Sequence, residues 1–407
     1  MYEVSLTTLS YGGDCLGRLP DGRVVFVPYG IPGERVAIEI VEDKRNFARG
    51  KLVKLLEPSP ERVEPHCKHF GHCGGCQYQH MTYEAQMSYK AVLLTEQLTR
   101  VGKLADIPSP QVIPSPDPFN YRNNLRFHVN EAGKLGFLTP HSDRVIPVTE
   151  CHLPEEPIAQ VWPEITLDTG SNIDQVELRC GLDGDVLISL KGVTEIPPEF
   201  ETEAGLSAVY ASPVRRMLLA GEDSLMMQVK ERDFQVSGGS FFQVNTPMAA
   251  IMVETLQKYL TLSKDDILMD LYCGVGLFSA FFAGSIKEAI GVEVSADACR
   301  DFIVNLDEFE NVSLYEGAVE RVLPELKLKP DVVILDPPRA GLHPRVIEAM
   351  LTNKPAQIAY ISCDPATLAR DLNRLTANGY SLEKVFLLDL FPQTYHLESI
   401  SFLKLSA

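Results

Sequence analysis

The sequence predicts an α/β protein with a small N-terminal β-barrel, a mixed α+β central part and a C-terminal parallel sheet covered by helices. Two observations carry this prediction. Short alternating strands separated by turn residues fill residues 1–56, and helix-like and strand-like stretches alternate from about residue 236 to the end. The 407 residues are 45% hydrophobic and 23% charged, which excludes a disordered chain and allows two to three domains of ~150 residues each.

Residues 1–56 are expected to form the barrel. The stretch Arg35–Ile40 alternates polar and apolar side chains, as a half-buried strand does, and Pro20-Asp21-Gly22 supplies a turn. Small barrels of evenly spaced short strands often bind oligonucleotides. Five basic residues of this segment form either a solvated face or a nucleic-acid contact, and both interpretations stay open: Lys44, Arg45, Arg49, Lys51 and Lys54.

Residues 57–82 and 108–235 are expected to form a central domain. Between these two stretches, residues 83–107 are expected to form a helix that packs on the C-terminal domain. The Tyr83–Gly102 stretch is rich in Ala, Leu, Gln and Lys, and Gly102 provides a stop signal. Residues 119–235 have the pattern of mixed strands, with turns such as Leu182–Asp185.

Residues 236–407 are expected to form a parallel sheet with helices on both faces, because helix and strand patterns alternate. The predicted elements are Met248–Leu260, Ile267–Tyr272, Gly276–Phe282, Ala289–Glu293, Ala296–Phe309, Val332–Leu335, Arg345–Leu351, Ile358–Ser362, Pro365–Asn378 and Lys384–Leu390.

No secretory or membrane segment is expected. The N-terminus lacks a basic start with an apolar core, and the hydrophobic window Leu268–Ile286 contains Asp270 and three glycines. Nine cysteines are an odd number for a secreted disulfide framework, and three of them cluster at Cys67, Cys73 and Cys76. We therefore expect a cytoplasmic protein without membrane partners, in which this cluster serves a metal, an inorganic cluster or catalysis.

A glycine-rich turn follows the strand that ends near Asp270. The string Asp270-Leu271-Tyr272-Cys273-Gly274-Val275-Gly276 lies where open α/β sheets bind ligands. The third glycine of a dinucleotide fingerprint is replaced by Ser279, which weakens a pyrophosphate site. Glu293 ends the next strand and can accept hydrogen bonds from ribose hydroxyls. Together these features are the usual arrangement for S-adenosylmethionine, although a bare turn and an exposed carboxylate would look alike.

Two further strands end in residues that could bind a ligand or take part in catalysis. Asp336-Pro337-Pro338-Arg339 presents Asp336 at the same sheet edge, unless this aspartate only begins a helix. Cys363 precedes Pro365, so it lies near a helix N-terminus, which would lower the thiol pKa and favour a thiolate; the alternative is an inert core cysteine. At the C-terminal end, His396 suits a structural hydrogen bond, and Glu398 alone could be a surface charge.

Five motifs occur together in one order. They are Phe242-Gln243-Val244-Asn245, Asp270–Gly276, Asp336–Arg339, Ser362-Cys363-Asp364-Pro365, and Phe391-Pro392-Gln393-Thr394 followed by His396-Leu397-Glu398. In this respect the chain resembles the RNA 5-methyluridine (uracil-C5) methyltransferases, in particular the ribosomal-RNA branch with a TRAM barrel and an iron–sulfur cluster. The resemblance covers nearly the full length and is weakest over residues 155–235. It implies a Rossmann-like, S-adenosylmethionine-dependent methyltransferase domain at residues 236–407 and an RNA-binding TRAM barrel at residues 1–56.

The resemblance also implies roles for individual residues. Cys363 matches the nucleophile that attacks uracil C6, and Glu398 matches the proton acceptor that removes the C5 proton. The positions that match the family's S-adenosylmethionine site are Gln243, Tyr272, Glu293 and Asp336. Asp336 and Gln243 are also expected to touch the uracil edge. The family's usual asparagine after the glycine turn is Leu277 here, so no polar contact is expected there.

The implied substrate is a uridine in structured RNA that must flip out of its stack. The barrel and the Tyr121–His128 stretch are candidates for holding the flanking RNA. 23S ribosomal RNA and a monomeric enzyme are expected, with transfer RNA as the alternative substrate. Cytosine-C5 or amino-group methylation is less consistent with Glu398 and Cys363. An RNA-binding iron–sulfur protein without catalysis is the alternative of another class.

The cysteine cluster is interpreted through the same resemblance. Cys67, Cys73, Cys76 and the distant Cys151 match the family's four ligands to a [4Fe-4S] cluster. Four thiolates would suit zinc equally by number, but gaps of five and then two residues are unusual for structural zinc. His66, His69 and His72 offer a rival zinc set. A structural or RNA-positioning role is expected, because the methylation needs no redox step.

Overall fold

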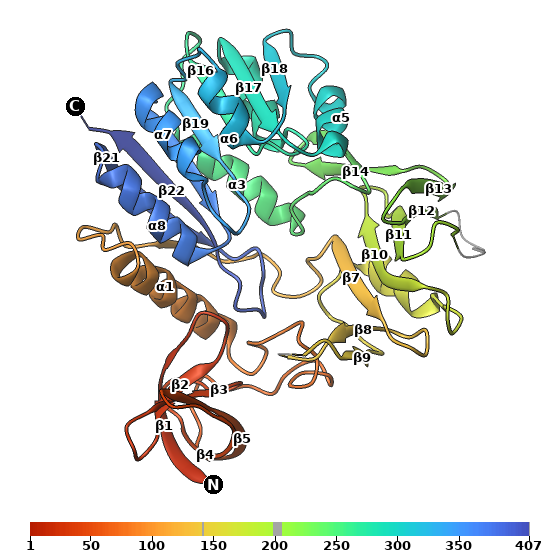
Figure 1. Ribbon diagram of the computed structural model, residues 1–407, viewed down its shortest axis with the longest axis vertical. Helices are drawn as coiled ribbons and strands as arrows, with labels where there is room; N and C mark the ends of the chain where they lie inside the picture. Colours follow the sequence, from red (N-terminus) through yellow and green to blue (C-terminus); the bar gives the residue numbers. More distant parts are fainter. Residues whose placement is uncertain (141, 198–205, 407) are drawn as a thin grey trace.

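Five strands close into a barrel at the N-terminal end of a computed structural model, which describes residues 1–140, 142–197 and 206–406 (Figure 1). Gly17 allows two of these strands to cross closely, since a Cβ there would clash with the Val4 side chain. The expected barrel is confirmed. Its strand order is β1 (Tyr2–Leu9), β2 (Cys15–Arg18), β3 (Val24–Val27), β5 (Phe47–Glu57) and β4 (Arg35–Asp43).

Helix α1 (Tyr83–Arg100) connects the barrel to the C-terminal sheet. The hydroxyl of Thr82 caps its first turn by accepting from the Ala85 amide, and the helix buries Leu93, Leu94 and Leu98. These leucines belong to a hydrophobic core that continues from the barrel interior to the C-terminal sheet. The helix packs against α8 (Pro365–Thr376).

The central part is a seven-stranded sheet, β13-β12-β11-β10-β7-β8-β9, with Phe127 packed against Trp162 in its core. Only β11 and β12 pair in parallel. A short helix α2 (Glu156–Val161) and a 3-10 turn η1 (Trp162–Glu164) accompany it. Its strands are β7 (Asn124–Val129), β8 (Leu135–Leu138), β9 (Val145–Pro147), β10 (Ile173–Cys180), β11 (Val186–Gly192), β12 (Ser207–Ala211) and β13 (Arg216–Ala220).

A hairpin of β14 (Ser224–Val229) and β15 (Arg232–Ser237) lies against the C-terminal sheet and its helices. Its buried side chains Met227 and Phe234 share one hydrophobic core with helix α3 (Thr246–Tyr259). The boundary expected at residue 235 therefore falls inside β15, within a segment that packs with the C-terminal elements.

The C-terminal sheet has the order β18-β17-β16-β19-β20-β22-β21-β6. The expected alternation of strands and helices is present, but the sheet is not wholly parallel. Strand β22 is antiparallel to both of its neighbours, and the edge strand β6 (Gln111–Ile113) comes from the linker after α1. The remaining strands are β16 (Ile267–Leu271), β17 (Glu288–Glu293), β18 (Val312–Glu316), β19 (Val332–Leu335), β20 (Gln357–Ser362), β21 (Tyr380–Leu388) and β22 (Glu398–Leu405).

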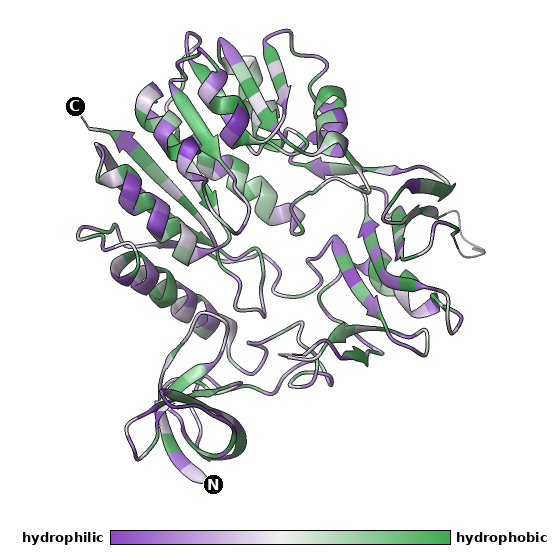
Figure 2. Cartoon of the chain, viewed as in Figure 1, coloured by the Kyte–Doolittle hydropathy of each residue, from purple (hydrophilic) through white to green (hydrophobic). Residues whose placement is uncertain are grey.

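Helices cover both faces of this sheet (Figure 1), and Figure 2 shows that these helices carry both polar and apolar residues. Successive strand residues point to opposite faces; Leu268 joins the core with α3, whereas Met269 joins the core with α8. The other elements are α4 (Leu277–Phe282), α5 (Ala296–Asn305), α6 (Val319–Val322), α7 (Pro344–Asn353) and the 3-10 turns η2 (Ala283–Ser285) and η3 (Leu323–Glu325).

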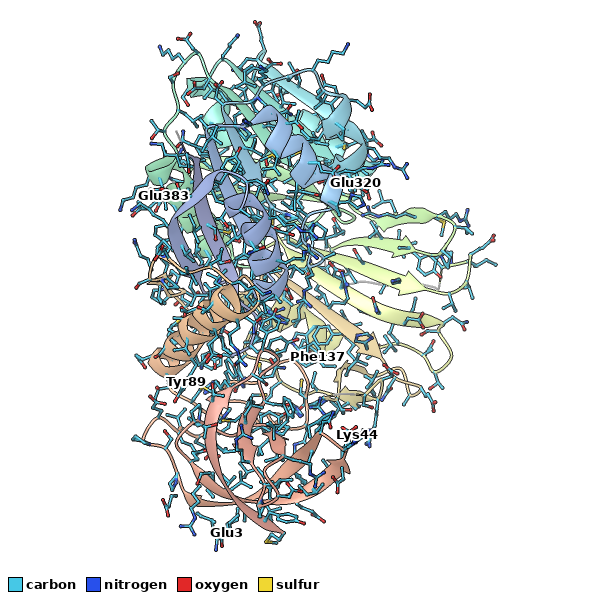
Figure 3. All side chains as sticks on the ribbon, turned by 60° about the vertical axis from the view of Figure 1, so that its left-hand side comes forward. Glu3, Lys44, Tyr89, Phe137, Glu320 and Glu383 are labelled. Carbon is cyan, nitrogen blue, oxygen red and sulfur yellow. The ribbon has the colours of Figure 1, made fainter. Side chains whose placement is uncertain are left out.

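The barrel and the far edge of the C-terminal sheet form opposite ends of the molecule. Figure 3 shows Glu3 and Lys44 on the barrel and Glu320 on the C-terminal domain above it. Within the described residues, every helix is too short or too polar to cross a bilayer.

Candidate active site and cysteine cavity

The carboxyl ends of the parallel strands β16, β17, β19 and β20 meet at one edge of the sheet. The candidate residues therefore lie together at this edge. The glycine turn follows β16, Glu293 ends β17, Asp336 follows β19 and Cys363 follows β20. This is the edge at which open α/β sheets bind ligands.

Asp270 holds the glycine turn in shape. Its carboxylate is fully buried and accepts from the Ser279 amide at 3.1 Å and from the Ser279 hydroxyl at 2.7 Å. Burial raises the pKa of Asp270 to about 6. Gly276 has φ +87°, and a Cβ there would clash with Leu306 and Phe302. The serine that replaces the third glycine of the fingerprint is thus the partner of the motif aspartate.

Glu293 lies against this turn. One carboxylate oxygen accepts from the Gly274 amide at 3.0 Å, and the other accepts from the amides of Val294 and Ser295 at 2.7 and 2.8 Å. A carboxylate offers about four acceptor positions, so capacity remains for a ligand hydroxyl. A Cβ placed on Gly274 would meet no atom within 4 Å, which leaves room for a ligand beside the turn.

Gln243 and Asp336 face each other across the same edge, with the Gln243 amide donating to the Asp336 carboxylate at 3.4 Å. Asn245, two residues after Gln243, caps α3 by accepting from the Met248 amide. This hydrogen bond fixes the chain just after Gln243. Burial raises the pKa of Asp336, and the nearby carboxylates Asp270 and Glu293 raise it further. A carboxylate in these surroundings is stabilised by a positively charged ligand.

The half-buried Cys363 lies beside two carboxylates. Burial raises the pKa of its thiol to about 12; Glu398 and Asp336 add to the rise, and Arg339 opposes it. The expectation of a lowered thiol pKa is therefore wrong. Burial and the two carboxylates outweigh the nearby helix N-terminus, whose first amides, those of Ala366 and Thr367, already donate to the Asp364 carboxylate.

Glu398 begins β22 and is 5% exposed, so it is not a surface charge. Burial raises its pKa well above the ordinary value, Asp336 raises it further, and Arg339 opposes the rise. The residue before β22 belongs to a loop, residues 389–397, which we call the catalytic loop. This loop carries the motif from Phe391 to Leu397.

Helix α1 anchors the catalytic loop from one side. The Lys90 ammonium donates to the Asp389 carboxylate at 2.7 Å and to the Phe391 carbonyl at 3.1 Å, and neither Lys90 nor Asp389 is exposed. Gln86 and Gln393 exchange two hydrogen bonds of 3.0 Å, one of them through the Gln393 backbone amide. The loop conformation is therefore fixed by a helix about 300 positions away in sequence.

Two residues near the centre, Arg339 and Tyr11, had no assigned role in the sequence-based prediction of the site. Arg339 contacts the His396 ring at 3.2 Å. Burial lowers the pKa of His396 to about 3, and the positive charges of Arg339, Arg122 and Lys90 lower it further, so its structural role as a neutral hydrogen-bonding group fits the expectation. Tyr11, from the turn after β1, donates to the Cys363 carbonyl at 3.4 Å. No sequence signal marks Tyr11, because that contact spans 352 positions.

The four candidate cysteine ligands line one cavity of about 350 Å³, together with Arg122, Tyr395 and His396. Two of the sulfurs accept hydrogen bonds of 3.4 Å from backbone amides: Cys67 from the amide of His69, and Cys73 from the amide of Gly75. Burial raises the pKa of Cys76 to about 12 and that of Cys151 to about 11, and the charge of Arg122 opposes both rises.

In the described part of the chain, one set of three donor atoms lies within 4.8 Å of one another: Cys67, Glu150 and His152. The rival histidine set does not form such a group. His69 instead accepts from the Thr149 amide at 3.1 Å, and the His66 ring contacts His152. Among the described residues, no three of the four cysteine sulfurs lie within 4.8 Å of one another.

The candidate RNA contacts are only partly accessible. Tyr121 is 3% exposed and donates to the Pro392 carbonyl at 3.0 Å, so it supports the catalytic loop instead of facing solvent. Arg126 is exposed and pairs with Glu177. On the barrel, Arg49 pairs with Asp14 at 2.8 Å and with Glu42 at 3.2 Å. The other four basic residues named in the sequence are exposed: Lys44, which pairs with Glu42 at 3.2 Å, Arg45, Lys51 and Lys54.

Comparisons with known proteins agree with this architecture. A family model described as tRNA (uracil-5-)-methyltransferase matches residues 220–406, and the TRAM domain model matches residues 1–53. The chain is 34% identical to an uncharacterized RNA methyltransferase of Nostoc sp., over 100% of this chain and 96% of that protein. It is 32% identical to one of Synechocystis sp., over 99% of this chain and 95% of that protein.

A solved structure is also similar over nearly the whole length. It is the Pyrococcus abyssi tRNA (uracil-54, C5)-methyltransferase in complex with S-adenosyl-L-homocysteine, with a TM-score of 0.77 and 24% identity. The match covers 98% of this chain and 100% of that chain. At this identity the likeness establishes the shared fold.

Proposed function

This chain belongs to the RNA uracil-5 methyltransferase family, and we propose that it methylates C5 of a uridine in structured RNA with Cys363 as nucleophile and Glu398 as proton acceptor. One observation supports the proposal most directly. Cys363, Glu398 and Asp336 lie together at the ligand-binding edge, and both carboxylates raise the pKa of the Cys363 thiol.

S-adenosylmethionine would bind at the glycine turn. The donor set fits it: Glu293 retains acceptor capacity for ribose hydroxyls, and Asp336 with Gln243 offers a negative surface to a cationic group. Tyr272 follows β16 in a positive-φ conformation and completes the predicted set. When bound, this group supplies an electrophilic methyl on a sulfonium.

The chemistry of uracil explains the need for Cys363. Carbon C5 is a poor nucleophile. When the Cys363 thiol gives its proton to a neighbouring carboxylate, its sulfur can attack C6 and move the ring electrons to an enolate. The enolate C5 can then bond to the methyl carbon, whose bond to sulfur would break so that the sulfonium leaves as a neutral thioether. Glu398 then takes the C5 proton, the C5–C6 double bond re-forms, and the thiolate leaves C6. Burial raises the pKa of Glu398, so once it has lost its own proton it is a stronger base than an exposed carboxylate, which suits the acceptor role.

The four cysteines would hold a [4Fe-4S] cluster. They line a single cavity of about 350 Å³, with two backbone amides already aimed at sulfur. Around one zinc ion with Zn–S bonds of ~2.3 Å, the sulfurs would lie ~3.8 Å apart. No three of these sulfurs form a group within 4.8 Å in the described chain, which favours a larger multi-atom group. Cys67, Glu150 and His152 remain the set for a single ion.

The domain assignment follows the same logic. We assign RNA binding to the barrel at residues 1–56, because Lys51 and Lys54 are exposed there while Tyr11 reaches the catalytic edge. The central part is assigned to residues 57–82 and 108–235, the connecting helix to residues 83–107 and the methyltransferase domain to residues 236–407, joined by the β14–β15 hairpin. Ribosomal RNA is proposed as substrate because the barrel and the cysteine set accompany that branch.

Two measurements test the proposal. Mapping 5-methyluridine in ribosomal and transfer RNA of a deletion strain should reveal a missing ribosomal-RNA site, and loss only from transfer RNA would move the substrate there. The Cys363→Ala variant should lose methylation while it still binds S-adenosylmethionine. Normal turnover by this variant would refute the nucleophile assignment.

A further inference from the structure

Arg122 stands between the cysteine cavity and the catalytic loop. Its side chain lines the cavity beside the four cysteines. On its other side, the guanidinium carbon lies 5.8 Å from the centre of the Phe391 ring and 5.7 Å from the Tyr121 ring. Its Nε donates to the Tyr121 hydroxyl at 3.4 Å. One planar cation therefore touches both the proposed metal site and the loop that leads to Glu398.

The backbone around Arg122 is fixed to the segment that carries Cys151. The Arg122 amide donates to the Leu153 carbonyl at 2.9 Å, and the Arg122 carbonyl accepts from the Glu155 amide at the same distance. Arg122 thus moves with the chain next to a proposed ligand, and its side chain spans from there to the catalytic loop.

Arg122 also lacks the usual partner of a guanidinium in protein interiors. In residues 1–140, 142–197 and 206–406, no carboxylate forms an ion pair with it. A half-buried cation without a counter-charge is costly, and so is a buried group of thiolates. A cluster held by thiolates in the cavity would place net negative charge beside Arg122. This charge would pair with the guanidinium, and the guanidinium would in turn stabilise the buried thiolates.

Arg122 supports the catalytic loop from the side of the cavity, and α1 holds the loop from another side. Lys90 and Gln86 of α1 hold Asp389 and Gln393, whereas the Phe391 ring rests on Arg122 and packs edge-on against His396 at 5.7 Å. The contacts from α1 do not reach the cavity. The loop also meets the cavity directly, because Tyr395 and His396 line it and the Gln393 carbonyl accepts from the Gln77 amide at 3.0 Å. Among these contacts Arg122 carries the positive charge, so it is the one that would respond to a change of charge in the cavity.

We propose that Arg122 is a positioning residue that couples occupancy of the cysteine cavity to the conformation of the catalytic loop, and through it to the placement of Glu398. The inference rests on the proposed metal group. With the cavity filled, the guanidinium is held over Phe391. With the cavity empty, it loses its counter-charge, is drawn toward water and releases the ring.

Amide hydrogen exchange of the full-length enzyme, followed by mass spectrometry, tests this coupling. The probe is the protein purified without air, compared with the same protein after iron is removed with an oxidant and a chelator. In the wild-type enzyme we expect exchange over residues 389–397 to be about tenfold faster after iron removal. Strand β20 serves as the internal measure of global folding, and its exchange should stay unchanged.

Two substitutions sharpen the test. Iron-loaded Arg122→Met should exchange over residues 389–397 as fast as stripped wild-type enzyme, because the cation over Phe391 is gone. Arg126→Met is the matched control, since Arg126 lines the same cavity but pairs with Glu177, and it should behave like loaded wild-type enzyme.

The outcomes separate the two proposals. Wild-type protein that binds no iron would overturn both the cluster and the coupling. Protein that binds iron but exchanges equally in both states would overturn the coupling alone. That comparison needs no variant, so it decides the question even if Arg122→Met fails to fold.

Discussion

The Lys90 ammonium lies 2.7 Å from the Asp389 carboxylate, and neither side chain is exposed to solvent. This pair joins α1 to the start of the catalytic loop. Tyr83 adds a hydrogen bond of 3.0 Å to the other Asp389 oxygen. Burial lowers the pKa of Lys90 while Asp389 raises it, as expected when a charge depends on its partner.

Removing one member of this pair should be costly. We expect Lys90→Met to lower the free energy of unfolding by about 3–5 kcal/mol, because Asp389 is left as an uncompensated buried charge. Denaturant unfolding measures this. The double variant Lys90→Met/Asp389→Asn should recover part of the loss, and Lys54→Met on the exposed barrel surface should change stability by less than about 0.5 kcal/mol. A double variant that is no more stable than Lys90→Met would argue against charge as the cause.

The reactivity of Cys363 should report its raised pKa. Below a pKa of about 12 the thiolate fraction grows about tenfold per pH unit, so the rate of alkylation at Cys363 by iodoacetamide should rise steeply from pH 7 to 9. Asp336→Asn removes a carboxylate that raises this pKa and should accelerate alkylation at pH 8.5. Glu383→Gln, exposed on β21 (Figure 3), is the control. Peptide mass spectrometry follows the single site, and a rate independent of pH would contradict this account.

Glu293 should matter for binding the methyl donor. We expect Glu293→Gln to weaken S-adenosylmethionine binding about tenfold, or ~1.4 kcal/mol, by titration calorimetry. The lost carboxylate charge weakens both the Gly274 contact and the acceptor for a ribose hydroxyl. Glu316, which ends the neighbouring strand β18 and is exposed, provides the control Glu316→Gln. Equal losses in the two variants would remove Glu293 from the binding site.

Cysteine substitution tests the metal site independently of activity. Cys76→Ser should bind much less iron than the wild-type protein when both are purified without air, and it should lose the broad visible absorption of a cluster. Cys15→Ser is matched to it, because the buried Cys15 thiol lies in the barrel, outside the cysteine cavity, and donates to the Thr8 carbonyl at 3.3 Å. A colourless wild-type protein that holds zinc alone would instead favour the set of Cys67, Glu150 and His152.

Much of the fold is local in the sequence. Strand β16 is an apolar run followed by a glycine turn, and the strand before Cys363 is an apolar run followed by Pro365. These local patterns predicted the ligand-binding edge of the sheet correctly. The antiparallel strand β22 was missed because its place between β20 and β21 depends on pairing between distant segments. The edge strand β6 was missed for the same reason.

The electrostatics of the site could be predicted less well. Asp364, just before Pro365, is itself a capping signal, and its carboxylate occupies the first amides of α8 near Cys363. The carboxylates that raise the Cys363 pKa come from other loops. The anchors Tyr11, Lys90 and Arg122 lie far from the catalytic residues in sequence, so only the folded chain reveals what they contact.

The central claim is that the Cys363 sulfur bonds to C6 of a uracil. Fluorine at C5 cannot leave as a proton does, so an enzyme that acts through this bond stays attached to RNA containing 5-fluorouridine. The most direct measurement is tandem mass spectrometry of the enzyme after reaction with such an RNA and S-adenosylmethionine. The account predicts a methylated fluorouridine on the peptide that contains Cys363. Unmodified Cys363, or a nucleotide attached to another residue, would contradict it.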